Sequence, residues 1–440
     1  MVTRLFPRFG LATAALALTV LSACEEPEII LPGPREDIRP VIDNETIAIS
    51  GASPISLPAQ TNNASWAQSP GTQAFRTTHA ALSSAPQRIW SASIGKGDSR
   101  KERITADPVV AGGLIYTLDS GATVSAVNAQ GQVAWQTGLI PASEKEGDAT
   151  GGGMAYANGV LYVSSGFGRL TAIDAQSGAI RWQKRLNATG SGAPLVSDGL
   201  LYVVAGDETA WVVDTKDGRI AWQIQGTPSV GNVLGAPAPV LASDLAVFAF
   251  GSGDIAAAFR RGGIRRWNAS VAGGRRGRAA ALIVDVTGGP MVVGNTVYIG
   301  NHSGRTVALD GATGERNWTA LEGAVDTVWP AGNSIFLISD RSQLVRLDAA
   351  DGSIVWAQDL PGFIKDKPGR RGPIVAHYGP ILAGGRIVIA SNDGFLRFFN
   401  PVDGALVHQV EVPGGATTAP VVAGQTLYVV STKGDLHAFR

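Results

Sequence analysis

The sequence predicts an all-β protein, an eight-bladed β-propeller whose blades are four-stranded antiparallel sheets. The main observation is a repeated phrase, in which a glycine is followed after three residues by a large ring at the end of a strand–turn–strand unit. Successive ring positions lie 38 to 52 residues apart. Repeats of about 40–50 residues made of short strands are typical of β-propellers. Seven copies of the phrase end on these residues: Trp135, Trp182, Trp222, Trp267, Trp318, Trp356 and His408.

Each repeat divides into four strands, A to D, by its alternating pattern and its turn residues. In the fifth copy we expect strands at about 290–294, 296–300, 305–310 and 315–318. Proline opens strand A in most copies, where it removes no hydrogen bond from the ladder. The C–D turns carry an aspartate four residues before the glycine, and we expect its carboxylate to bond the turn backbone. These aspartates are Asp174, Asp214, Asp310 and Asp348.

The repeated tryptophans are predicted to be structural. A blade is a single sheet that buries both faces against its neighbours, and one large ring per blade fills the gap between them. The last copy, 419–440, supplies only three strands, and the segment 87–90 before the first copy supplies a fourth with its own ring, Trp90. We therefore expect the N-terminal strand to close the ring and to complete the eighth blade, which abolishes an exposed sheet edge.

The first residues are typical of a bacterial lipoprotein. Arg4 and Arg8 precede an apolar run at 11–21, which is too short to span a bilayer, and the run ends in Leu-Ser-Ala-Cys24. This ending resembles a lipobox, and the resemblance implies that Cys24 is lipidated, becomes the first residue of the mature chain and is N-acylated. Glu25 follows the cysteine, so sorting to the outer membrane is expected. The mature protein should be held at the membrane by its acyl chains, facing the periplasm.

We predict three segments: a signal peptide at 1–23, a lipidated N-terminus with an extended tether at 24–85, and the propeller at 86–440. The tether is rich in proline, serine, asparagine and threonine and makes a poor core. Trp66 breaks this pattern. It either docks on the folded body or is a stray aromatic in a solvated linker, and the sequence favours neither.

Composition and motifs argue against several function classes. Lys+Arg and Asp+Glu are equal at 36 each, so no overall field attracts nucleic acid. The phrase at 172–182 resembles the repeat of pyrroloquinoline-quinone (PQQ) dehydrogenases, which carry an adjacent cysteine pair and a calcium site. This chain has one cysteine, and its five histidines lack metal-ligand spacing. We therefore expect no catalytic residues, no cofactor and no metal.

Long connections between strand D of one blade and strand A of the next are the irregular part of the repeat. The longest are at about 136–151, 223–236, 268–288 and 357–379. All D–A and B–C loops emerge on one face, and insertions confined to one face usually mark the binding face. The third of these loops contains Arg275, Arg276 and Arg278, a candidate basic patch for an acidic protein or for lipid head groups.

Lipobox, tether and a PQQ-like ring without quinone ligands together resemble the BamB family, the propeller lipoproteins of the outer-membrane β-barrel assembly (BAM) machinery. The resemblance implies a non-catalytic scaffold that docks on the periplasmic (POTRA) domains of BamA, beside other BAM subunits, and helps to insert outer-membrane proteins. Unfolded outer-membrane proteins are a second class of partner that it implies.

The resemblance also points to two neighbouring D–A loops as the contact with BamA. They contain Val230, Val233 and Leu234 in the first loop and Asp285 and Thr287 in the second. Leu234 stands where the family commonly has arginine, Asp285 matches the first of two family aspartates, and Thr287 replaces the second. Two alternatives stay open: an envelope lipoprotein that binds another peptide or glycan, and a relative of the PQQ dehydrogenases.

Overall fold

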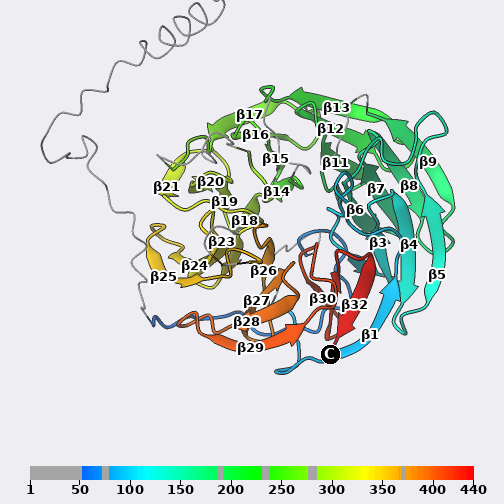
Figure 1. Cartoon of the computed structure of the whole chain (residues 1–440). Helices are drawn as coiled ribbons and strands as arrows, with labels where there is room; N and C mark the ends of the chain where they lie inside the picture. Colours follow the sequence, from blue (N-terminus) through cyan, green and yellow to red (C-terminus); the bar gives the residue numbers. More distant parts are fainter. Residues whose placement is uncertain are drawn as a thin grey trace, which may run out of the picture. The chain divides into compact units, whose positions relative to one another are not determined.

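The blades follow one another around a ring in the computed structural model (Figure 1). The structure describes residues 52–71, 79–186, 188, 192–229, 237–275, 285–365, 367 and 373–440. These residues belong to one compact unit, Ala48–Arg440. They form eight separate four-stranded antiparallel sheets, so the predicted eight-bladed propeller is confirmed.

The first four blades each take four consecutive strands. Blade 1 contains β2 (Val109–Ala111), β3 (Leu114–Leu118), β4 (Thr123–Asn128) and β5 (Val133–Gly138). Blade 2 contains β6 (Gly152–Ala157), β7 (Val160–Ser165), β8 (Arg169–Asp174) and β9 (Ile180–Arg185). Blade 3 contains β10 (Leu195–Ser197), β11 (Leu200–Val204), β12 (Thr209–Asp214) and β13 (Ile220–Gln225). Blade 4 contains β14 (Val240–Ala242), β15 (Leu245–Ala249), β16 (Asp254–Phe259) and β17 (Arg265–Ser270).

The remaining blades repeat this order until the ring closes. Blade 5 contains β18 (Met291–Val293), β19 (Thr296–Gly300), β20 (Thr306–Asp310) and β21 (Arg316–Ala320). Blade 6 contains β22 (Trp329–Ala331), β23 (Ser334–Ile338), β24 (Gln343–Asp348) and β25 (Ile354–Asp359). Blade 7 contains β26 (His377–Ala383), β27 (Arg386–Ser391), β28 (Phe395–Phe399) and β29 (Leu406–Glu411). Blade 8 contains β30 (Val421–Ala423), β31 (Thr426–Val430), β32 (Asp435–Phe439) and β1 (Arg88–Ser93).

Burial changes across each blade in the way the packing requires. In blade 2 the second strand, β7, is buried at all six positions, because both faces of the blade are covered by its neighbours. The fourth strand, β9, alternates between exposed and half-buried residues. The core therefore lies between blades, and the D strands form the rim of the ring.

Every C–D pair carries one β-bulge, immediately before the ring position of the phrase. In blade 1, Trp135 lies opposite Ala126, whereas Val133 lies opposite Val127, so Ala134 is the extra residue. The same register shift occurs in the C–D pairs of blades 2 to 7. A bulge bends the strand and redirects the side chain beside it, which helps to turn each ring toward the next blade.

The eighth blade joins the first and the last strands of the propeller, as the sequence predicts. β1 pairs with β32, with Trp90 opposite Ala438. Beyond the last pair, the amide of Gln87 donates to the carbonyl of Arg440 at 2.8 Å and the amide of Arg440 donates back at 2.9 Å. In Figure 1 the blue β1 lies beside the red β32 near the C-terminus. This pairing closes the ring.

Residues 52–71 and 79–85, parts of the predicted tether, form a strap against the propeller. Trp66 is 1% exposed, and its backbone exchanges two hydrogen bonds with Val110 of β2, at 2.7 and 2.9 Å. Its indole stacks on that of Trp329 in blade 6, with ring centroids 6.0 Å apart. Blades 1 and 6 are not neighbours in the ring, so Trp66 packs across its central channel. Of the two alternatives for this residue, docking on the folded body is the one observed.

The strap also fixes which face of the ring it covers. The amide of Gly384 donates to Ala80, and that of Gly424 donates to Asn63, at 2.9 and 2.8 Å. Both glycines belong to A–B turns, those of blades 7 and 8. Arg346, fully buried, donates to the Ser53 carbonyl at 2.7 Å. The strap therefore lies on the face of the A–B and C–D turns, and the D–A and B–C loops form the opposite face.

Candidate functional site

The joints between blades show which repeated residues are structural. In every blade from 8 around to 6, the indole Nε1 of the ring tryptophan donates to a carbonyl in the C–D turn of the next blade. The donor and acceptor pairs, at 2.9 to 3.2 Å, are Trp90 and Ala129, Trp135 and Ala175, Trp182 and Thr215, Trp222 and Arg260, Trp267 and Gly311, Trp318 and Ala349, and Trp356 and Pro401.

The glycine of the phrase serves the same joint. A Cβ atom on Gly314 would lie 2.6 Å from the Trp267 ring, and Gly314 has a φ of +75°. The turn glycine of each blade from 1 to 7 has this relation to the tryptophan of the preceding blade. The phrase therefore links two blades: its glycine receives the ring of the blade before, and its own ring packs on the glycine of the blade after.

His408 departs from the rule at the ring closure. The next blade is blade 8, in which strand D comes from the N-terminal segment, so no C–D turn connects β32 to β1. There is consequently no turn glycine to receive an indole. The imidazole packs on Phe398 of its own blade, with centroids 5.2 Å apart, and its buried Nε2 has no hydrogen-bond partner among the described residues.

The candidate partner face carries a buried ion-pair cluster that joins three loops. Arg275, in the D–A loop after blade 4, donates from Nε and Nη2 to both carboxylate oxygens of Asp340, at 2.9 and 3.0 Å. It also donates to Glu322 at 3.1 Å, and Arg341 donates to the other oxygen of Glu322 at 2.6 Å. Bidentate arginine–carboxylate pairs of this kind fix geometry as well as charge.

The cluster determines the protonation of its members. Hydrogen bonding to Asp340 raises the pKa of Arg275, so its positive charge is secure. Burial raises the pKa of Glu322, whereas the positive charges of Arg341 and Arg275 lower it. Removing one partner would leave a buried charge without compensation. The cluster is therefore a fixed support for these loops.

This arrangement corrects the predicted basic patch at Arg275. The side chain is only 8% exposed, and its charge is offset by Glu322 and Asp340. Glycine-rich surroundings suggested a solvated arginine, but the acceptors come from the next blades and lie 47 and 65 residues away in sequence. Arg276 and Arg278 lie outside the described residues. No sequence signal marked Glu322, Asp340 or Arg341.

The predicted partner residues fall on or beside the same loops. Val230, Val233 and Leu234 lie outside the described residues. Asp285 is 4% exposed, and its backbone carbonyl accepts from the amide of His302 at 2.9 Å. Thr287 is half-buried, with its hydroxyl donating to the Ala324 carbonyl at 3.3 Å. Asp285 and Thr287 thus anchor the C-terminal part of the second loop. Arg275 is the last residue of this loop that the structure describes before residues 276–284.

Two half-buried carboxylates, those of Asp107 and Asp326, interact electrostatically, and the first also contacts the strap. Asp107 accepts from the hydroxyl of Ser69 in the strap and from the amide of Ala419 at 2.8 Å. Asp326 accepts from the amide of Gly379 at 2.8 Å. Burial, and then the charge of Asp326, raise the pKa of Asp107. Within the described part of the chain, no three histidine, cysteine, aspartate or glutamate residues are grouped as metal ligands would be.

The signal region and Cys24 lie outside the described residues, so the lipid anchor stays a prediction. Among the residues that the structure describes, no helix has the length and apolar character needed to cross a bilayer.

Fold and joints define the class of protein: an eight-bladed β-propeller of PQQ-like repeats. The family model described as "Outer membrane protein assembly factor BamB" matches residues 120–358 and 335–440. The chain is 31% identical over 360 residues to BamB of Escherichia coli K12, which covers 80% of this chain and 88% of that protein. It is 30% identical over 351 residues to BamB of Legionella pneumophila, which covers 79% and 86%.

Solved structures show the same fold. BamB from Moraxella catarrhalis superimposes with a TM-score of 0.65 at 19% identity, over 81% of this chain and all of that one. A quinohemoprotein alcohol dehydrogenase from Comamonas testosteroni gives 0.64 at 13% identity, over 86% and 81%. The fold is therefore shared with enzymes. The chain belongs to the BamB family of outer membrane protein assembly factors.

Proposed function

We propose that this protein is a non-catalytic, lipid-anchored scaffold of the outer-membrane β-barrel assembly machinery, which docks on the POTRA domains of BamA and faces the periplasm. The observation that carries the proposal is the family match, which extends over 80% of the chain, to proteins named as outer membrane protein assembly factors. Fold alone would not suffice, because quinohemoprotein dehydrogenases share it.

The docking surface that we propose is the D–A and B–C face. The strap covers part of the opposite face, whereas two of the long loops on the D–A face include the five predicted partner residues. The second loop is held by the ion-pair cluster of Arg275 at one end and by the buried Asp285 at the other. A loop held at both ends loses less conformational entropy on binding. In this proposal Asp285 positions the loop, and the other predicted partner residues contact BamA.

Co-purification from detergent-solubilised envelopes tests this docking. The variant Leu234→Glu with Thr287→Arg changes both loops, and Arg219→Glu on a C–D turn of the opposite face is its matched control. We expect the double variant to lose BamA and to lower the amount of porins in the outer membrane, while the control retains both. Failure of the wild-type protein to retain BamA, or full retention by the double variant, would refute the docking proposal.

The anchor is tested separately. We propose that residues 1–23 are a signal peptide and that Cys24 carries the acyl chains, with the residues after it forming the tether. Cys24→Ala should release the protein in soluble form from cells that express it, because in this proposal the acyl chains hold it at the membrane. Retention of this variant in washed membranes from a strain without the other BAM subunits would contradict the lipid anchor.

The structural likeness to quinohemoprotein dehydrogenases gives the second candidate, an enzyme. Titration of the purified chain with pyrroloquinoline quinone and calcium checks it. We expect no saturable change in the quinone absorbance. A stoichiometric shift would overturn the non-catalytic proposal.

A further inference from the structure

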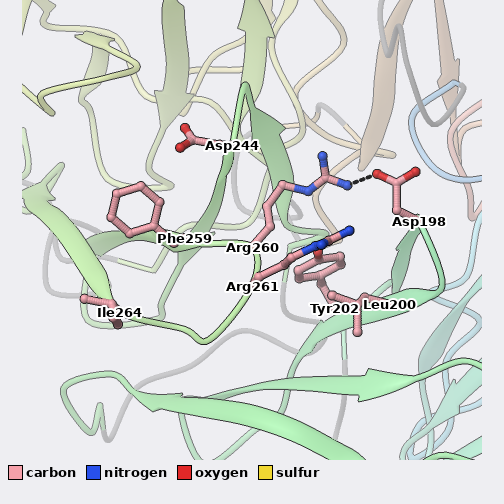
Figure 2. A pocket seen from close by; sticks show the side chains of 8 residues that line it. All are labelled: Asp198, Leu200, Tyr202, Asp244, Phe259, Arg260, Arg261 and Ile264. Carbon is pink, nitrogen blue, oxygen red and sulfur yellow. Dashed lines mark hydrogen bonds and ion pairs between the residues drawn. The ribbon is translucent and has the colours of Figure 1, made fainter.

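A pocket on the A–B and C–D face, between blades 3 and 4, is separate from the proposed docking loops. Its volume is about 390 Å³, and eight residues line it (Figure 2). They are Asp198, Leu200, Tyr202, Asp244, Phe259, Arg260, Arg261 and Ile264. We call this site the blade 3–4 pocket.

The pocket exists because the C–D turn of blade 4 breaks the rule of the other turns. Elsewhere an Asp or Asn side chain caps the turn: the Asp310 carboxylate accepts from the amides of Ala312 and Thr313 at 3.0 and 2.9 Å. In blade 4 the equivalent residue is Phe259, followed by two arginines. Phe259 is 36% exposed and Ile264 is 70% exposed, so this turn presents apolar surface where the others present a carboxylate or an amide.

The blade 3–4 pocket also contains a buried hydroxyl that makes no hydrogen bond of normal geometry. Tyr116 and Tyr162, at the equivalent position in blades 1 and 2, donate to the turn carbonyl of the next blade at 3.1 and 3.4 Å. Tyr202 is fully buried and does not make this bond. Arg260 is the polar side chain beside it, and a guanidinium can only donate. The Tyr202 proton therefore has no acceptor.

Two further donors in the pocket are unused. Arg260 is paired through Nη2 with Asp198 and with the hydroxyl of Ser197, the latter at 3.1 Å, but its buried Nε has no partner. Arg261 makes no ion pair or hydrogen bond with any described residue. Figure 2 shows the Asp244 carboxylate directed away from the guanidinium groups of Arg260 and Arg261. Two buried donors without acceptors, Tyr202 Oη and Arg260 Nε, lie in a pocket whose rim carries the exposed guanidinium of Arg261, and this combination favours an anion.

The charges indicate which anion. Asp198 neutralises Arg260, so only Arg261 contributes an uncompensated positive charge, and Asp244 adds a negative charge to the lining. A phosphate carries about −1.5 to −2 at neutral pH and would be repelled by the two aspartates. A carboxylate carries a single charge and matches one guanidinium. Apolar surface from Phe259, Ile264 and Leu200 favours an apolar group next to that charge.

We propose that the blade 3–4 pocket binds a peptide through one carboxylate that is carried on, or lies next to, an apolar residue. The carboxylate accepts from Arg261 and from the hydroxyl of Tyr202, and the apolar side chain lies against the turn of blade 4. The carboxylate comes either from a chain terminus or from an acidic side chain. The site is independent of the proposed BamA docking, which uses the other face.

Fluorescence anisotropy with labelled peptides tests the proposal on the full chain in detergent. The probes are Gly-Ser-Gly-Ser-Phe with a free C-terminal carboxylate, the same peptide as its amide, and an amidated peptide with internal Glu-Phe. We expect at least one of the two carboxylate peptides to bind at least about tenfold more tightly than the amidated Gly-Ser-Gly-Ser-Phe, which has no carboxylate, as a charge-assisted hydrogen bond implies. The two carboxylate peptides distinguish the terminus from the side chain.

Variants tie this binding to the pocket. Arg261→Gln should weaken it roughly 10- to 100-fold, and Tyr202→Phe roughly tenfold, since each removes one bond to a charged acceptor. Arg219→Gln, an exposed arginine on the C–D turn of blade 3, should leave it unchanged. Thermal unfolding by circular dichroism confirms that each variant is folded, and BamA co-purification should be unaffected.

Three results would overturn the proposal. The first is that the amidated Gly-Ser-Gly-Ser-Phe binds as tightly as both carboxylate peptides. The second is binding that does not change in Arg261→Gln. The third is that neither carboxylate peptide binds at 1 mM, so that the binding free energy is weaker than about −4 kcal/mol. This result would overturn the proposal even if vesicles of anionic phospholipid bind in a way that depends on Arg261.

Discussion

The joint between blades 4 and 5 and the joint between blades 7 and 8 solve the same packing problem in different ways. In the first, the Trp267 indole donates to Gly311 at 3.0 Å and packs on Gly314 of the next blade. In the second, His408 packs on Phe398 of its own blade and has no turn to meet. The tryptophan of each phrase therefore depends on a covalent C–D turn in the neighbouring blade.

The largest expected effect comes from removing the ring at a regular joint. Trp267→Ala should lower the free energy of unfolding by about 3–5 kcal/mol, because it deletes a buried indole and leaves the Gly311 carbonyl without its donor. His408→Ala should cost only about 1 kcal/mol. Urea unfolding followed by tryptophan fluorescence and circular dichroism measures both. Equal losses at the two positions would break the distinction between the joints.

Acid should destabilise blade 7, which lies next to the ring closure, before it destabilises the joints that contain a tryptophan. His377 in blade 7 is held between the Ser391 hydroxyl and the Pro361 carbonyl, at 2.7 and 3.0 Å, and burial lowers its pKa from 6.5 to about 4. The unfolded chain therefore binds the proton more readily. The stabilisation is complete above pH 6.5 and is lost as the pH falls toward 4, by up to about 3 kcal/mol.

The variant His377→Gln isolates this contribution from other titrating groups, because glutamine retains hydrogen-bonding capacity without titrating. Unfolding free energies of both proteins are measured from pH 7 to pH 4. We expect the wild type to lose more stability than the variant over that interval. Parallel pH profiles would show that His377 is not responsible. Burial also lowers the pKa of His437 in blade 8, which adds to the same trend.

A smaller effect is expected at the glycine of a regular joint. Gly314→Ala places a methyl group 2.6 Å from the Trp267 ring at a φ of +75°, which should cost roughly 1–3 kcal/mol through crowding and backbone strain. Gly424→Ala is the control, since its φ is +56° but no atom lies within 4 Å of the added Cβ. The cost of Gly314→Ala beyond that of the control measures the contact with the ring. It should vanish in the background of Trp267→Ala.

The smallest effect is expected from His408→Trp, at the joint between blades 7 and 8. His408→Trp restores the repeat in sequence, but the indole meets neither a turn glycine nor a turn carbonyl in blade 8. We expect a change in unfolding free energy of less than about 1 kcal/mol in either direction. A stabilisation of about 3 kcal/mol, as a complete joint would give, would show that the closure blade offers an acceptor after all.

Much of the fold could be predicted, because its information is local. The spacing of the phrase from Trp135 to His408 gave the period, and the orphan Trp90 beside a three-stranded last repeat gave the closure. The candidate site was harder to predict from the sequence. The loops were recognisable by their length, but the burial of Arg275 depends on Glu322 and Asp340, which lie 47 and 65 residues further along the chain. No pattern within one loop reports such partners.

The blade 3–4 pocket could be predicted from the sequence only in part. Phe259, Arg260 and Arg261 break the turn pattern visibly in sequence. That Tyr202 lacks the bond made by Tyr116 and Tyr162 is visible only in three dimensions.

The sequence by itself determined the number of blades, the order of their strands and the closure of the ring, because propeller blades are built from neighbours in the chain and repeat their local signals. Only the tertiary structure decided that Trp66 packs against Trp329 across the ring, that Arg275 and Asp285 are buried, and that the glycine of one blade receives the ring of another. Each of these depends on groups brought together from distant parts of the chain, where packing and desolvation, rather than local propensity, set the outcome.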